Sequence, residues 1–163
     1  MTKIETQTVC VTGAAGFLGS KLCHELAYRG SNVIAIDNFA VGERGSLSEI
    51  ENKIEIIKAD IRDKDSIKEY INKSDTIFHL AAIDDRKACQ KDYELAFNVN
   101  IKGTANILSL CSSMQRFIYM SSNMVYGEAR YLPIDELHPL DGYEPYATTK
   151  ISSEYLCKGY NFR

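Results

Sequence analysis

Short apolar segments recur along the chain and are separated by longer segments of mixed polarity. Their boundaries fall at residues 8–12, 32–37, 53–59, 76–82 and 116–122. In these segments hydrophobic positions follow one another with little alternation. Strands of this kind are typical of a parallel sheet that is covered on both faces. We therefore expect five parallel strands.

The segments between these strands have helical periodicity. Leu18, Leu22 and Leu26 recur every fourth residue and predict a helix over 17–29, which Gly30 ends. Further helices are predicted from a cap at Asp63 or Asp65 to about Lys73, over 92–113, and from Pro145 onward. Residues 38–48 and 123–144 are predicted to be loops. Strands and helices in alternation predict an α/β fold with a Rossmann-type, doubly wound parallel sheet.

A glycine-rich loop connects the first predicted strand to the first predicted helix. Gly13, Gly16 and Gly19 follow the pattern G-x-x-G-x-x-G. In a dinucleotide-binding β-α-β unit, such glycines permit a tight turn, close approach of a pyrophosphate, and packing of the helix on the sheet. The free N–H groups at the helix N-terminus then face the phosphates. Taken alone, the pattern fits an ordinary strand-to-helix turn equally well.

Asp37 favours the dinucleotide interpretation. It ends the second predicted strand, about 20 residues after the glycine loop, where a carboxylate binds the ribose hydroxyls in such folds. The alternative is a turn residue at a strand end. A carboxylate at this place repels a 2′-phosphate, so we expect NAD rather than NADP.

Composition narrows the class of protein. The chain has 163 residues, 45% of them hydrophobic and 25% charged, with a formal net charge of −3. This length suggests one domain, residues 1–163. No basic stripe indicates a nucleic-acid or membrane partner, and no apolar run has the ~18 residues of a membrane-spanning helix. The five cysteines form no C-x-x-C pattern, which favours reduced thiols in a cytoplasmic protein without a metal site.

A second candidate site combines Ser122 with Tyr146 and Lys150. A tyrosine and a lysine four residues apart lie on one face of a helix. A nearby ammonium stabilises a phenolate, so we expect a lowered tyrosine pKa that suits a general base. Ser122 lies at the C-terminal end of a predicted parallel strand, where ligands of such sheets bind, so its hydroxyl could bind a substrate oxygen. The alternative for the Tyr-Lys pair is an ordinary surface pair on a helix.

The order and spacing of several motifs resemble the extended short-chain dehydrogenase/reductase family, specifically NAD-dependent epimerases and dehydratases acting on nucleotide sugars. The matching segments are TGAAGFLG at 12–19, DNF at 37–39, ADIRD at 59–63, HLAA at 79–82, NIKGT at 100–104, SSNMVYG at 121–127 and PYATTK at 145–150. The segment at 83–87 is more charged than the corresponding loop of the family, which leaves the contacts on the substrate side open.

The resemblance implies a set of site residues. Ser122, Tyr146 and Lys150 match the catalytic serine or threonine, tyrosine and lysine. The residues expected to bind NAD are Gly13, Gly16, Phe17, Leu18, Gly19, Asp37, Asn38, Asp60, Ile61, Leu80, Ala81, Ala82, Asn100, Tyr146 and Lys150. Asp60 and Ile61 would flank the adenine, and Asn100 would support the active-site helix. His79 is expected to be a packed residue at a strand end.

The resemblance also implies a reaction. Dehydratases of the family carry an Asp-Glu pair after the catalytic serine or threonine, whereas Asn123 and Met124 stand here. Elimination of water is therefore not expected. The segment DNFAVGER at 37–44 also resembles sugar 4-epimerases and UDP-glucuronate enzymes of the family. The resemblance implies a 4-epimerase that oxidises a UDP- or dTDP-sugar transiently to a keto-sugar, with Tyr146 as the base. Alternatives are a non-catalytic NAD-binding module and another enzyme of the family, such as a decarboxylase or reductase.

Members of this family run to about twice the present length. From the resemblance we expect the NAD-binding portion of a longer protein, truncated before a C-terminal substrate domain. We also expect a homodimer, and a chain that binds NAD but turns over nucleotide sugars poorly.

Overall fold

The computed structural model describes residues 4–160, and this part of the chain forms two compact units. Unit 1 extends to Ala81 and also includes Asn106–Met120. Unit 2 includes Ala82–Ala105 and continues from Ser121. The division therefore falls within helix α5 (Gly103–Leu110).

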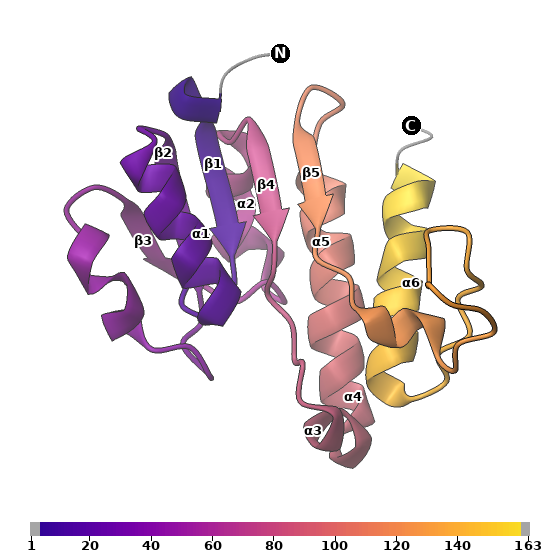
Figure 1. Cartoon of the computed structure of the whole chain (residues 1–163). Coiled ribbons are helices and arrows are strands. Elements are labelled where there is room, and N and C mark those ends of the chain that lie inside the picture. The colour runs from indigo at the N-terminus through magenta and orange to yellow at the C-terminus, as the bar shows by residue number, and fades with distance from the viewer. Residues whose placement is uncertain (1–3, 161–163) are drawn as a thin grey trace. The chain divides into compact units, whose positions relative to one another are not determined.

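Unit 1 is built on a five-stranded sheet (Figure 1). Its strands are β1 (Thr8–Thr12), β2 (Asn32–Asp37), β3 (Glu55–Lys58), β4 (Thr76–His79) and β5 (Arg116–Tyr119). They lie in the order β3-β2-β1-β4-β5, and each neighbouring pair is parallel. This is the order of the first five strands of the Rossmann fold. The predicted α/β class with a parallel sheet is confirmed.

Three strands are shorter than the apolar segments that predicted them. Segments 53–59, 76–82 and 116–122 contain only the four-residue strands β3, β4 and β5. Apolar residues such as Ala59, Leu80 and Met120 continue past the last paired residue of each strand, so the apolar pattern does not mark where pairing ends. Ser122 therefore lies beyond the end of β5, where it is the N-cap of a short 3-10 helix, η4 (Asn123–Tyr126).

The two faces of the sheet are covered by different helices (Figure 1). Helix α1 (Phe17–Tyr28) and the 3-10 helix η2 (Arg44–Ile50) pack on the face that carries Val9, Val11 and Val33. The alternate positions Cys10, Ile34 and Ile36 are also buried and point to the opposite face, because side chains alternate along a strand. Helix α2 (Lys64–Asn72), with Ile67 and Ile71 buried, lies behind the sheet in Figure 1. A further short 3-10 helix, η1 (Ile4–Thr6), precedes β1.

Part of the predicted loop at 38–48 is the 3-10 helix η2. Leu47 and Ile50 of this helix are fully buried in the core of unit 1. The flanking serines, glutamates and glycine hide this signal in the sequence, since only two positions point inward. Tertiary burial rather than local propensity thus orders this segment.

Unit 2 is mainly helical. Its elements are α3 (Arg86–Lys91), α4 (Tyr93–Ala96), the π-helix η3 (Phe97–Lys102), the start of α5, η4 and α6 (Pro145–Tyr160). The single helix predicted over 92–113 is thus interrupted by a π-helical segment and ends at Leu110. Helix α3 was not predicted; the Asp85 carboxylate caps it by accepting hydrogen bonds from the Lys87 and Ala88 amides.

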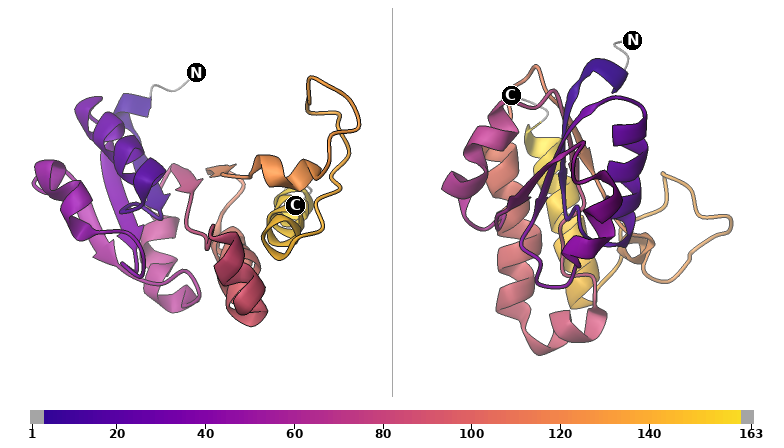
Figure 2. Two further views of the ribbon diagram at one scale, coloured as in Figure 1. Left: turned by 60° about the horizontal axis from the view of Figure 1, so that its bottom comes forward. Right: turned by 90° about the vertical axis from the view of Figure 1, so that its left-hand side faces the viewer.

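A long loop connects η4 to α6. Figure 2 shows this loop, drawn in orange, standing out from α6. Of the helices in residues 4–160, none has the length and apolar character that crossing a membrane requires.

The approach of α1 to the glycine loop yields a stability prediction. A Cβ at Gly19 would lie 2.0 Å from the Gly13 carbonyl oxygen, so backbone must move to admit it. Overpacking costs about 1–3 kcal/mol, and a clash with a backbone atom lies toward the upper end of that range, so it outweighs the roughly 1 kcal/mol that alanine gains over glycine within a helix. We expect Gly19→Ala to lower the free energy of unfolding by about 1–2 kcal/mol in a urea titration.

Gly45 offers the matched control. A Cβ there has no heavy atom within 4 Å, so Gly45→Ala should change the free energy of unfolding by less than about 0.5 kcal/mol. Equal unfolding midpoints for Gly19→Ala and the unchanged chain would contradict the close contact between α1 and the loop.

Candidate functional site

The glycine loop of unit 1 lies against the chain that leaves β4. Gly13 has a positive φ of 70°, and a Cβ there would lie 2.7 Å from the Ala81 amide nitrogen. The Leu80 and Ala81 amides donate hydrogen bonds to the carbonyl and hydroxyl oxygens of Thr12. The predicted residues Gly13, Leu80 and Ala81 are therefore neighbours in unit 1. Only glycine permits both the turn and the contact at this position.

The N-terminus of α1 has no side-chain cap. Gly16 is its N-cap and has no side chain to act as an acceptor, whereas Asp63 and Asp85 cap α2 and α3 through their carboxylates. Phe17 and Leu18 follow in the first turn with exposed fractions of 81% and 53%. The first N–H groups of α1 thus have no side-chain acceptor, which is the arrangement that binds phosphate groups at helix N-termini.

The carboxylate of Asp37 fastens the glycine loop to the end of β2. Its Oδ2 accepts a hydrogen bond from the Ala15 amide at 2.9 Å, and its Oδ1 accepts one from the Phe39 amide at 2.7 Å. Asp37 is 9% exposed. Since each carboxylate oxygen can accept more than one hydrogen bond, both oxygens keep capacity for the hydroxyls of a ribose.

Asn38 and Asp60 are brought together beside this carboxylate. The Asn38 amide donates to the Asp60 carboxylate at 2.9 Å, and the Arg62 guanidinium binds both oxygens of Asp60 at 2.9 and 2.7 Å. The hydrogen bonds from Arg62 hold the pKa of Asp60 far below its usual range. Ile61 is buried, and its carbonyl oxygen accepts a hydrogen bond from the Asn106 amide.

His79 is packed inside unit 1, as expected. It is 1% exposed, its Nδ1 lies 2.7 Å from the Thr12 hydroxyl, and its ring packs against Phe117 and Tyr119. The next two residues, Leu80 and Ala81, belong to unit 1, whereas Ala82 begins unit 2.

Unit 2 brings together the three residues predicted to be catalytic. Tyr146 and Lys150 lie one turn apart on α6, and the Lys150 Nζ is 5.9 Å from the centre of the Tyr146 ring. Both are buried, with exposed fractions of 9% and 3%. The Ser122 hydroxyl accepts a hydrogen bond from the Met124 amide and acts to lower the pKa of the Tyr146 phenol.

Burial governs the pKa values of this pair. It lowers the pKa of Lys150 from 10.5 to about 8. The pKa of Tyr146 is raised, chiefly by burial and against the effect of the Ser122 hydroxyl. The lowered tyrosine pKa expected from the sequence is therefore wrong for the chain alone. A buried phenolate requires more stabilisation than one neighbouring ammonium supplies.

Asn100 connects the π-helix to the active-site helix. Its side chain binds the backbone of Ile83 through both oxygen and nitrogen, at 2.8 and 3.0 Å, and donates to the Thr149 hydroxyl at 3.0 Å. The Thr149 hydroxyl donates to the Tyr146 carbonyl oxygen, and the Ser153 hydroxyl lies within hydrogen-bonding distance of the Asn100 carbonyl oxygen. These bonds fix the position of α6, which carries Tyr146 and Lys150.

Sequence reasoning missed Thr149 and Ser153. Both are buried, and their four-residue spacing on one face of α6 was the available signal. It also missed the ion pair between Arg86, at the start of α3, and Glu144, directly before α6.

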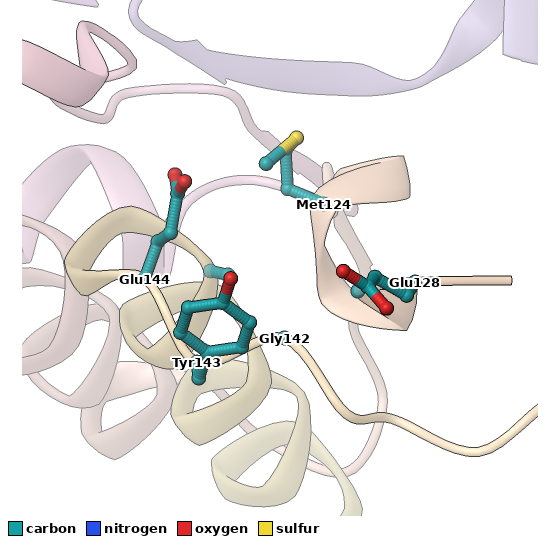
Figure 3. Close-up of a pocket in the computed structure, with 7 residues that line it drawn as sticks. Met124, Glu128, Gly142, Tyr143 and Glu144 are labelled. Carbon is teal, nitrogen blue, oxygen red and sulfur yellow. The ribbon is translucent and has the colours of Figure 1, made fainter.

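A small pocket lies next to the N-terminus of α6 (Figure 3). Its volume is about 170 Å³, and it is lined by Met124, Gly127, Glu128, Gly142, Tyr143, Glu144 and Ala147. Met124 also packs against the buried cluster that contains Tyr146. The pocket therefore borders the candidate base, and its charged lining residues are both acidic.

Of the cysteines, Cys89 packs in the buried cluster with Tyr146, and its thiol donates a hydrogen bond to the Ile83 carbonyl oxygen. None of the five, all of which lie within residues 4–160, forms a disulfide, and Cys10, Cys23 and Cys89 are buried. Burial raises the pKa of the Cys10 and Cys23 thiols, which keeps them protonated and unreactive. Residues 4–160 contain no group of His, Cys, Asp or Glu side chains that could hold a metal ion.

Comparison with known proteins extends this picture. Residues 9–162 match the NAD dependent epimerase/dehydratase family. The chain is 38% identical over 157 residues to the UDP-N-acetyl-alpha-D-glucosaminuronate decarboxylase of Bacillus cytotoxicus, covering 92% of this chain and 49% of that protein. It is 34% identical over 158 residues to the UDP-glucose 4-epimerase of Mycolicibacterium smegmatis, and the match covers 92% of this chain and 50% of that protein.

A solved structure shows the same fold. The UDP-glucose 4-epimerase of Thermus thermophilus, in complex with NAD, matches with a TM-score of 0.86 and 29% identity, covering 95% of this chain and 51% of that one.

The sheet order and the glycine loop define a dinucleotide-binding protein of the α/β class. Within that class the chain belongs to the NAD dependent epimerase/dehydratase family, as its motifs predicted. It spans about half the length of the curated relatives it matches.

The buried ammonium of Lys150 makes stability depend on pH in a defined window. Between about 8 and 10.5 the unfolded chain holds this proton and the folded chain releases it, so stability rises with pH there. Removing the group by Lys150→Met abolishes that gain. We expect the stability of the unchanged chain, relative to Lys150→Met, to rise by about 1.4 kcal/mol for each pH unit inside the window.

The measurement is urea unfolding at several pH values from about 7 to about 10. Lys158→Met is the control, since Lys158 is exposed on the same helix, and its stability difference should stay constant. A pH-independent difference for Lys150→Met would contradict the lowered pKa of Lys150.

Proposed function

We propose that the chain is the NAD-binding and proton-transferring part of a nucleotide-sugar epimerase. The observation that carries the proposal is the group formed by Ser122, Tyr146 and Lys150 in unit 2. It occurs in a chain whose family is NAD-dependent and whose relatives include UDP-sugar 4-epimerases. The proposed substrate is a UDP- or dTDP-sugar.

The residues of unit 1 fit NAD. The α1 N-terminus without a side-chain cap offers N–H groups to the pyrophosphate, and Gly16 presents no side chain to it. The Asp37 carboxylate would accept hydrogen bonds from the adenosine ribose, and a 2′-phosphate would meet its negative charge. Asn38, Asp60 and Ile61 are assigned to the adenine side, and Leu80, Ala81 and Ala82 to the remainder of the dinucleotide.

The proposed chemistry uses three side chains of unit 2. Tyr146 removes the proton from a sugar hydroxyl, Lys150 stabilises the phenolate, and the Ser122 hydroxyl binds the sugar oxygen as it becomes a carbonyl. Bound NAD⁺ would accept hydride from the sugar carbon and later return it to the opposite face. Because burial raises the pKa of Tyr146, its deprotonation requires positive charge nearby, which Lys150 supplies in part.

Two observations bear on other reactions. Asn123 and Met124 cannot exchange protons usefully, which weighs against elimination of water. The 38% identity to a sugar-uronate decarboxylase keeps decarboxylation as the second candidate. A non-catalytic NAD-binding module is the third, and it is distinguished by NAD binding without turnover.

The test of the proposed function is the variant Tyr146→Phe. It keeps the aromatic ring but removes the base, and general base catalysis typically contributes about 10²–10⁴-fold. In a chain extended to the full length of its relatives, we expect conversion of UDP-glucose to UDP-galactose in the presence of NAD to slow by that factor, while NAD affinity in calorimetry changes little.

Tyr155→Phe is the matched control, because Tyr155 is 61% exposed on the same helix. It should keep the rate of the unchanged chain. Retention of most of the activity by Tyr146→Phe would refute its role as the base. NAD binding with no turnover of any UDP- or dTDP-sugar by the extended chain without substitutions would favour the non-catalytic module.

A further inference from the structure

The loop between η4 and α6 closes on itself. The Gly142 amide donates to the Val125 carbonyl oxygen at 3.0 Å, and a Cβ on Gly127 would lie 2.8 Å from the Asp141 carbonyl oxygen. Residues 127–142 therefore form an Ω loop whose two ends are in contact. Figure 2 shows its course away from α6.

His138 is the buried centre of this Ω loop. It is 3% exposed, whereas residues 128–137 are all exposed. Its ring packs against the rings of Tyr126 and Tyr131, with centre-to-centre distances of 5.4 and 4.8 Å. The loop is thus folded around one imidazole rather than around an apolar side chain.

Two backbone groups fix the protonation state of this imidazole. The Arg130 amide donates a hydrogen bond to Nε2 at 3.0 Å, and Nδ1 lies 3.0 Å from the Pro139 carbonyl oxygen. A backbone amide can only donate and a carbonyl can only accept, so Nε2 must carry the lone pair and Nδ1 the proton. A second proton on Nε2 would eliminate the acceptor and set two N–H groups against each other.

The charged and titratable groups around the ring offset the destabilisation of a protonated imidazole only in part. They are Tyr126 from η4, and Tyr131, Asp135 and the Arg130–Asp141 ion pair from the loop itself. Asp135 attracts a positive imidazole. However, its Oδ1 already accepts hydrogen bonds from the Tyr131 hydroxyl and the Leu137 amide, at 2.7 and 3.0 Å.

We propose that His138 is a proton-sensitive positioning residue that holds the Ω loop closed only while its imidazole is neutral. Both ends of the loop line the pocket shown in Figure 3, through Gly127 and Glu128 on one side and Gly142 and Tyr143 on the other. Protonation of His138 opens the loop and with it the wall of this pocket. The consequence for sugar binding rests on the proposed function, whereas the loop transition does not.

The test is hydrogen exchange of the Arg130 amide by NMR, at about pH 7.5 and about pH 5.5, which bracket the usual titration of imidazole. Rates are corrected for the intrinsic pH dependence of amide exchange. Loss of one buried hydrogen bond predicts about 10- to 100-fold less protection at the lower pH. His138→Gln keeps an acceptor without a titratable group, so its protection should be the same at both pH values.

His24→Gln is the matched control, because His24 belongs to unit 1 and should leave the pH-dependent loss intact. Equal protection of the unchanged chain at both pH values would overturn the proposal, as would a pH-dependent loss that persists in His138→Gln. If the Arg130 amide of His138→Gln exchanges rapidly at both pH values, the variant is uninformative and the test is made on the unchanged chain alone. The NMR titration of the His138 ring must then follow the loss of Arg130 protection with the same midpoint, and separate midpoints would overturn the proposal.

Discussion

The two hydrogen bonds accepted by the Asp37 carboxylate organise the nucleotide-binding end of unit 1. One joins β2 to the glycine loop through the Ala15 amide, and the other orders the turn after β2 through the Phe39 amide. The glycine loop with the exposed first turn of α1 follows the end of β1. The Asn38–Asp60 contact joins residues that follow the ends of β2 and β3. Hydrogen bonds to a charged acceptor are worth about 1.5–3 kcal/mol each, so this carboxylate is structural as well as available for a ligand.

Unit 2 is organised by buried polar groups rather than by a large apolar core. Asn100, Thr149 and Ser153 satisfy one another and hold α6 against the π-helix. A π-helical turn changes the direction of backbone carbonyl groups. Here the Asn100 carbonyl oxygen lies within hydrogen-bonding distance of the Thr104 and Ser153 hydroxyls. This arrangement buries Lys150 and Tyr146 at a cost in stability. The lowered pKa of the Lys150 ammonium reflects that cost and also places its titration nearer to neutrality.

Much of the fold could be predicted from the chain, because the strands of a buried parallel sheet are apolar and the glycine loop and Asp37 occur in a fixed order. The ends of β3, β4 and β5 could not be predicted, because apolar residues continue past the last hydrogen bond that pairs each strand with its neighbour. The π-helix at 97–102 has no sequence signal, because one displaced hydrogen bond hardly changes the spacing of apolar residues. The direction in which the pKa of Tyr146 shifts could not be predicted, because the sequence shows the neighbouring lysine but not the burial that raises this pKa. The Asn100 network and the His138 loop depend on contacts between distant segments.

We propose that the Asp37 carboxylate makes unit 1 selective for NAD over NADP, and calorimetric titration of the chain with NAD⁺ and NADP⁺ measures this selectivity. Repulsion between the Asp37 carboxylate and a 2′-phosphate disfavours NADP⁺, so NAD⁺ should bind about 10- to 100-fold more tightly than NADP⁺. Asp37→Asn, which keeps the shape but removes the charge, should narrow that ratio, whereas Asp63→Asn at the cap of α2 should not. Equal or tighter binding of NADP⁺ by the unchanged chain would contradict the account.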